Sequence, residues 1–209
     1  MNQRSRTGVA AVVLAALTAL STCSALTDMA SVIASLKKLQ FKVDGVRDFK
    51  LLGIDLGGKA ALSDFTAGDA LKAVQSYRSR KLPVEFVVDI LAVNPNDGTG
   101  GSRRSASTLT ALECRLLIDG KPTVTGNIDR PIDIPGTGEQ SVVPLRLSLD
   151  LLEFFGDRRY EDILGLALAL GGKQRSAAKI ALDAQPTVST PFGPITYPDR
   201  ITIVSTEFR

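Results

Sequence analysis

The chain has 209 residues, of which 44% are hydrophobic and 22% charged, so its composition is that of a globular protein rather than a disordered one. The formal net charge is +3, and Arg4 and Arg6 supply two of those charges. Without the first 22 residues the chain carries 23 basic and 22 acidic side chains, a balance that argues against a nucleic-acid partner.

The N-terminal segment has the pattern of an export signal. Residues 8–20 are uncharged and mostly apolar, too short a run to cross a bilayer comfortably, and they follow two arginines. The tetrapeptide Leu20-Ser21-Thr22-Cys23 then resembles a bacterial lipobox, in which the cysteine is lipidated and becomes the first residue of the mature chain. The alternative is ordinary cleavage near Ser24-Ala25, which would discard Cys23.

This interpretation predicts a lipoprotein signal peptide over residues 1–22 and lipidation of Cys23, followed by a tether over residues 23–39. Cys114 is then the single unmodified cysteine, so no disulfide framework is expected. It lies on the even-numbered, apolar face of residues 112–118, which predicts a thiol packed in the core.

The longest apolar stretch covers residues 83–93 and predicts an interior strand. One side carries only apolar residues, and the other is interrupted by Glu85 and Asp89. The strand must end at Asn94-Pro95-Asn96, because proline cannot donate to a sheet and both asparagines can bond to local backbone.

A helix is expected between Ser63 and Arg80, capped by Ser63 or Thr66. Five apolar residues share one of its faces, the pattern of an amphipathic helix: Phe65, Ala70, Leu71, Val74 and Tyr77.

The other predicted elements are strands at hairpin spacing with a few helices inserted. Asp119-Gly120 is a strong hairpin turn, and Asp150 caps a short helix. In order, they are one bent or two short strands at 41–56; strands at 108–118 and 121–128; an edge-like segment and turn at 131–138; a strand at 141–149; helices after Asp150 and at 160–170; and strands at 178–188 and 195–208. This order predicts a mainly β fold, an antiparallel sandwich over residues 40–209 as one domain.

The loop after residue 93 and the helix after Asp150 hold the candidate binding residues. Asn94, Asn96 and Asp97 could offer oxygen atoms to Ca²⁺, although Asx-turn bonding is the simpler interpretation. Arg103 and Arg104 could meet anionic headgroups or simply be solvated. Phe154 and Phe155 form either an apolar lip between the sheets or a plug for the open end of the core.

The residues available for catalysis are few. The sequence has no histidine and no Gly-x-Ser-x-Gly elbow, and the single mature cysteine excludes a cysteine-rich zinc site. Residues 53–59 satisfy Gly-x4-Gly-Lys, but Ala60 stands where a P-loop needs a hydroxyl. We therefore expect no catalytic residues, metal or cofactor, and no enzyme.

Several motifs, in their order, carry a resemblance to a known family. They are Asn94-Pro95-Asn96 after a long strand, the Ile118–Lys121 hairpin, residues 126–135 reading Gly-Asn-Ile-Asp-Arg-Pro-Ile-Asp-Ile-Pro, and the 189–194 segment Ser-Thr-Pro-Phe-Gly-Pro. Residues 83–205 resemble the LEA type 2 family (late embryogenesis abundant, with the WHy domain) in its bacterial lipoprotein form, and residues 40–82 look like an extension. The resemblance implies an immunoglobulin- or fibronectin-III-like sandwich, an association with desiccation and other stress, and no catalytic residues.

The functional expectation is a non-enzymatic, membrane-anchored protein that protects or stabilises the cell envelope under stress. The alternative is a periplasmic module that binds a lipid or apolar ligand between its helices and sheets, near Phe154, Phe155 and residues 164–170. Its expected partners are the membrane, through the lipid on Cys23, and a lipid or an envelope protein. Ser24 after Cys23 resembles the sorting signal for the outer membrane, facing the periplasm.

Overall fold

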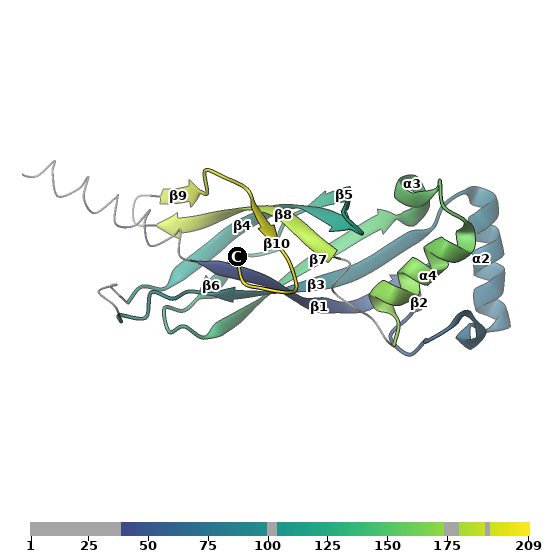
Figure 1. Cartoon of the computed structure of the whole chain (residues 1–209), viewed down its shortest axis with the longest axis horizontal. Helices are drawn as coiled ribbons and strands as arrows, with labels where there is room; N and C mark the ends of the chain where they lie inside the picture. Colours follow the sequence, from purple (N-terminus) through teal and green to yellow (C-terminus); the bar gives the residue numbers. More distant parts are fainter. Residues whose placement is uncertain (1–38, 100–103, 174–179, 191–192) are drawn as a thin grey trace, which may run out of the picture. The chain divides into compact units, whose positions relative to one another are not determined.

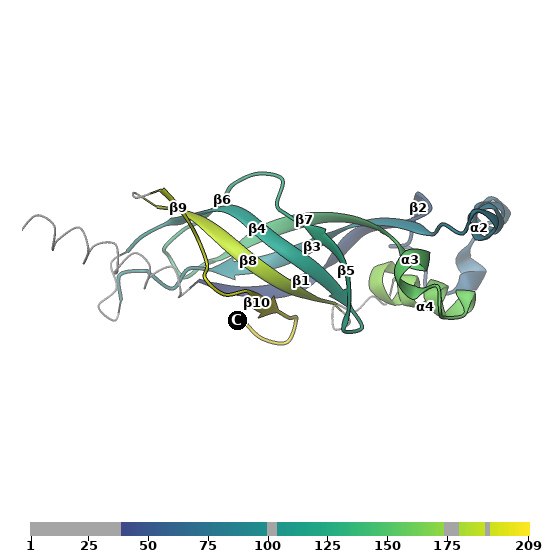
Figure 2. The same cartoon turned by 90° about the horizontal axis from the view of Figure 1, so that it is seen from above.

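Two antiparallel sheets pack face to face and enclose an apolar core (Figures 1 and 2). The computed structural model describes residues 39–99, 104–173, 180–190 and 193–209. The first sheet has the order β2 (Ile54–Asp55), β1 (Gln40–Leu51), β3 (Pro83–Val93), β7 (Gln140–Asp150). The second has the order β10 (Ile201–Ile203), β8 (Ile180–Thr190), β4 (Ser107–Ile118), β5 (Lys121–Gly126). Short strands β6 (Ile132–Ile134) and β9 (Gly193–Thr196) pair with β4 and β8. The predicted antiparallel sandwich is confirmed.

Strand β3 is the interior strand that its sequence predicts. It pairs with β7 without interruption from Pro83↔Asp150 to Val93↔Gln140, and with β1 on its other side. The apolar face is buried along its whole length, from Val84 to Ala92, while Glu85 is exposed on the other face. Alternation of side chains across the strand is what places this face in the core.

Strand β1 shows that the N-terminal extension is an integral part of the sandwich. It is one bent strand whose pairing with β3 shifts between Val43 and Gly45 and again between Arg47 and Lys50. Such bulges bend a strand without ending its pairing. Because β1 covers the full edge of β3, residues 40–82 are not an appendage to the segment 83–205.

Turns and edges follow the local sequence, with one correction. Asp119 and Gly120 both have positive φ, 49° and 75°, as a two-residue hairpin turn requires. The strand expected over residues 195–208 is instead split into β9 and β10, because Pro198 lies between them in an irregular segment. After β10, the chain crosses to the first sheet, where Phe41 and Arg209 exchange two backbone hydrogen bonds of 2.7 and 2.9 Å.

The helices gather at one end of the sandwich, beyond the ends of β1, β4 and β7 (Figures 1 and 2). They are the short 3-10 helix η1 (Leu62–Asp64), α2 (Ala67–Ser79), α3 (Leu151–Phe155) and α4 (Tyr160–Gly171). Thr66, not Ser63, caps α2, since its hydroxyl accepts a hydrogen bond from the Asp69 N–H. Within the described ranges, no helix is both long and apolar enough to cross a membrane.

Helix α4 closes the helical end over the core. Its buried residues include Ile163, Leu166 and Leu170, and a Cβ on Gly171 would come within 2.2 Å of the Phe49 ring. Glycine at this position therefore lets the C-terminal end of α4 lie directly against β1. We call this end of the sandwich the helical end. The opposite end, where β3 meets the loop after residue 93, is the loop end.

Candidate functional site

At the loop end, the two asparagines expected to offer ligand atoms are turned inward. Asn94 and Asn96 are 0% and 2% exposed. The Asn94 side chain donates to the carbonyl oxygens of Ser105, at 2.8 Å, and Ile134, at 3.3 Å. Its oxygen accepts from the backbone N–H and side-chain amide of Asn96, at 3.1 and 2.8 Å. This is the Asx-turn interpretation, extended into a set of hydrogen bonds that joins two connections, β3–β4 and β6–β7, and that we call the clasp.

Gly136 completes this clasp from the β6–β7 connection. A Cβ there would come within 2.5 Å of the Ser105 oxygen and 2.7 Å of the Asn96 oxygen, so the backbones approach more closely than any side chain allows. The loop end is thus held by polar groups that bind their own chain.

The remaining predicted loop residues lie outside the clasp. Asp97 accepts hydrogen bonds from the Thr99 hydroxyl and N–H, at 2.6 and 2.8 Å, and these bonds hold the pKa of its carboxyl below the ordinary value. Arg104 is exposed. Arg103 and Cys23 lie outside the described residues. The structure therefore does not bring Asn94, Asn96 and the arginine together on one accessible surface.

Phe154 and Phe155, predicted to form either an apolar lip or a plug of the core, differ in burial. Phe155 is 0% exposed, with Lys121 and Arg158 stacked over its ring at 5.3 and 4.9 Å, so it plugs the core. Phe154 is half-buried, and its carbonyl accepts a hydrogen bond from Lys121. Phe155 therefore fills the end of the core, which is the plug interpretation. Of the two residues, only Phe154 is exposed enough to serve as an apolar lip.

Helix α2 is the element whose orientation departs most from its pattern. An apolar stripe on a helix normally packs on the core. Here Leu71, Val74 and Tyr77 are 60%, 48% and 64% exposed. The inward face is instead small and polar, with Ser76 buried and Ala73 half-buried. The helix is held through this polar face and leaves its apolar face uncovered.

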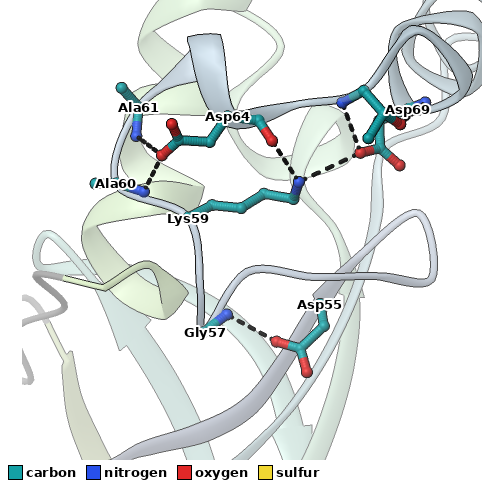
Figure 3. Close-up of polar contacts among 8 residues, drawn as sticks. Asp55, Gly57, Lys59, Ala60, Ala61, Asp64 and Asp69 are labelled. Carbon is teal, nitrogen blue, oxygen red and sulfur yellow. Dashed lines mark hydrogen bonds and ion pairs between the residues drawn. The ribbon is translucent and has the colours of Figure 1, made fainter.

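Polar contacts below α2 explain why this orientation is stable (Figure 3). Lys59, the lysine of the P-loop-like segment, donates to the Asp64 carbonyl at 2.8 Å and reaches the Asp69 carboxylate at 3.3 Å. Asp69 also accepts from the Thr66 N–H at 3.0 Å, and this bond is the main reason that its pKa lies below the ordinary value. The lysine amine is directed at carboxyl and carbonyl oxygens of its own chain, which leaves it badly placed to hold a phosphate.

A groove of about 790 Å³ lies between α2 and the α3–α4 region. Val74 and Tyr77 line it from α2, and Leu152 and Tyr160 from the other side. Tyr77 and Tyr160 meet edge to face with ring centroids 5.3 Å apart, and the Tyr160 hydroxyl donates to the Ala73 carbonyl at 3.4 Å. The charged residues in its lining are Arg78, Arg158, Arg159 and Glu161.

The sequence did not lead us to predict this groove, because we did not consider that the apolar face of α2 could be exposed. The signal was present on the opposite face, where Asp69, Ala73 and Ser76 recur at positions i, i+4 and i+7. A helix whose small polar residues share one face can pack through that face instead.

No metal-binding arrangement is found in the described ranges. They contain no group of three or more His, Cys, Asp or Glu residues placed to hold a metal ion. Cys114 is 2% exposed, as predicted, and burial raises the pKa of its thiol to about 11, so it is a poor nucleophile. Burial likewise raises the pKa of Tyr197.

Comparison with known proteins adds little to this geometry. No family model matches the chain, and no curated protein matches it. Among solved structures, a protein from Archaeoglobus fulgidus is similar at a TM-score of 0.31 and 11% identity, covering 60% of this chain and 87% of that one. A likeness this low carries no argument about fold or function.

Proposed function

We propose that this protein is a non-enzymatic module of the bacterial cell envelope, similar to the LEA type 2 family. In this proposal a lipid on Cys23 anchors it to the outer membrane on the periplasmic side, and it protects or stabilises envelope components under drying or osmotic stress. The basis is the lipobox-like Leu20–Cys23 and the motifs at Asn94-Pro95-Asn96 and residues 189–194, together with the sandwich fold.

One observation supports the non-enzymatic part most directly. The described residues that are polar and buried are Ser76, Asn94, Asn96 and Ser107, and each makes a hydrogen bond within its own chain. An active site needs polar groups that converge on a cavity and remain available to a substrate. These four side chains fix turns and loops instead.

The alternative function, a lipid or apolar ligand held between helices and sheets, requires space at that junction. Phe155, Ile163 and Leu170 are each 0% exposed there, so apolar side chains already occupy it. We therefore place the protective role first and let co-purified lipid decide the alternative.

Intact mass of the membrane-extracted protein, measured beside a Cys23→Ala variant, tests the anchor. A diacylglyceryl or triacylglyceryl mass on the native chain, absent from the variant, is the expected result. An unlipidated chain that begins near Ser24 would refute the anchor. Non-covalent lipid that survives mild extraction would instead support the ligand-binding alternative.

Drying a sensitive enzyme such as lactate dehydrogenase in the presence of this protein tests protection separately. The proposal expects more recovered activity than with an equal mass of an unrelated β-sandwich protein. Equal recovery with both would contradict the protective role and leave the anchor result unaffected.

A further inference from the structure

The exposed apolar side chains of the described residues are concentrated on one segment. Five large hydrophobic residues are exposed, and four of them lie between residues 62 and 77: Leu62, Leu71, Val74 and Tyr77. The fifth, Val142, lies alone on the edge strand β7. Isolated apolar residues on a surface need no explanation, whereas a cluster beside a groove indicates a binding surface.

The charge on the α2 side of this cluster is positive. Helix α2 and the two residues after it carry Lys72, Arg78, Arg80 and Lys81 against one acid, Asp69, which already contacts Lys59. The groove adds Arg158 and Arg159, and their ion pairs with Asp119 and Glu161, at 3.4 and 3.7 Å, join partly exposed side chains. Such surface pairs are weak, so they leave the arginines able to meet a new partner.

We propose that the exposed face of α2 and the adjoining groove dock an amphipathic helical segment of another protein, one with an apolar face and acidic flanks. Val74 and Tyr77 on one wall and Leu152 and Tyr160 on the other would contact its apolar face, and Ala73 also lines the groove from α2. Tyrosine and arginine are among the residue types enriched at the energetic centres of protein interfaces. An apolar groove between helices is a recurrent docking site for an amphipathic helix.

Charge and area make a second copy of this chain a poor occupant. A two-fold pairing of α2 with its copy would bring the lysines and arginines of one helix against the same cationic surface of the other. The helix has 13 residues and is therefore only about 20 Å long, too short to bury by itself the roughly 1,200 Å² that a stable dimer needs.

The position of α2 also favours a protein over the membrane that would hold the lipid. Strand β1 begins at the loop end, where Gln40 pairs with Val93, and α2 lies at the helical end (Figure 1). The 12 residues of β1 separate them by about 40 Å. The groove therefore lies about one strand length from Leu39, the point where the proposed tether would join the sandwich.

A photo-crosslinking amino acid at Val74 of the full-length protein, expressed in its native cells, identifies the occupant. Val142, exposed to a similar extent but outside the cluster, is the matched control. We expect an adduct from position 74 only, and mass spectrometry of the joined peptide should place it in an amphipathic segment with acidic flanks. Adding Arg78→Glu should reduce the adduct several-fold. Four outcomes would each overturn the proposal: an adduct to lipid, an adduct to a second copy, equal labelling at both positions, or no adduct at position 74.

A designed pair of 18-residue peptides tests the charge requirement with the purified full chain. Both have the same leucine and alanine face, and one carries glutamates where the other carries lysines. The acidic peptide should bind at least tenfold more tightly, shift the NMR signals of Val74 and Tyr160, and lose affinity in high salt. A Tyr77→Ser variant, with its fold checked by circular dichroism, should bind several-fold more weakly. Equal affinity for both peptides would contradict the proposal.

Discussion

The two ends of the sandwich place polar and apolar side chains in opposite ways. At the loop end, Asn94 and Asn96 are buried and hold two connections together through hydrogen bonds, so few polar groups are left for a ligand. At the helical end, Leu71 and Tyr77 are exposed while Ser76 is buried under the helix. Buried polar groups fix one end in shape, and exposed apolar groups leave the other end with a surface that a partner can cover.

This comparison separates residues that support the fold from residues that are available for binding. If it is correct, substitutions in the core and in the clasp should lower the free energy of unfolding, and substitutions on the outer face of α2 should not.

Replacing the plug at the helical end should have the largest effect. Phe155→Ala removes a ring that is 0% exposed and should cost about 3–5 kcal/mol of unfolding free energy in urea denaturation. Phe154→Ala is the control, because its half-buried ring should cost clearly less. Equal losses from the two variants would show that Phe154 belongs to the core as well.

Breaking the clasp at the loop end should have the next largest effect. Asn94→Ala leaves the Ser105 and Ile134 carbonyls without their side-chain donor, and each buried group left unsatisfied costs about 1–3 kcal/mol. We expect a loss of about 2–3 kcal/mol by the same denaturation measurement. A loss below about 0.5 kcal/mol would mean that the loops are held without the clasp.

The contacts that hold α2 should make the free energy of unfolding depend on pH in the acidic range. The pKa of Asp69 is lowered in the folded protein, chiefly by the Thr66 N–H, from an ordinary value of 3.8. Folding therefore favours its charged form, and this contribution is present above that value and lost as the pH falls through the lowered pKa. Asp69→Asn should lose less stability than the wild type between about pH 5 and 3. A parallel loss in both proteins would assign the acid sensitivity to other carboxylates.

Truncating the outer face of α2 should have the smallest effect on stability. Leu71→Ala alters a side chain that is 60% exposed and should change the unfolding free energy by less than about 0.5 kcal/mol. Leu116→Ala, with the same substitution at a 0% exposed position, should cost about 2–5 kcal/mol. A cost at Leu71 close to that at Leu116 would mean that α2 packs inward in solution.

Much of the fold could be predicted because its signals are local. The alternation in residues 84–92 predicts a strand with one buried face, Asp119-Gly120 predicts a hairpin, and Asp150 predicts a helix start. All three are confirmed, the last by a 3.0 Å bond from the Leu152 N–H to the Asp150 carboxylate. Each depends on residues that are neighbours in the chain.

The rest depends on contacts that a sequence pattern does not contain. The Asn94 clasp needs Ile134, 40 residues away, so the asparagines could be assigned to a turn but not to the interior. The orientation of α2 depends on Lys59 reaching Asp69 and on Tyr160 reaching Ala73, 87 residues away. Periodicity identifies the apolar face of a helix, but distant contacts decide which way that face points.

The exposure of Tyr77 in solution tests this account most directly. The sequence has three tyrosines, and Tyr77 is 64% exposed whereas Tyr197 is 8% exposed. With 3-fluorotyrosine incorporated and each signal assigned by a Tyr→Phe substitution, a soluble paramagnetic agent should broaden the Tyr77 signal strongly and the Tyr197 signal weakly. Protection of Tyr77 equal to that of Tyr197 would show that α2 buries its apolar face and would contradict the account.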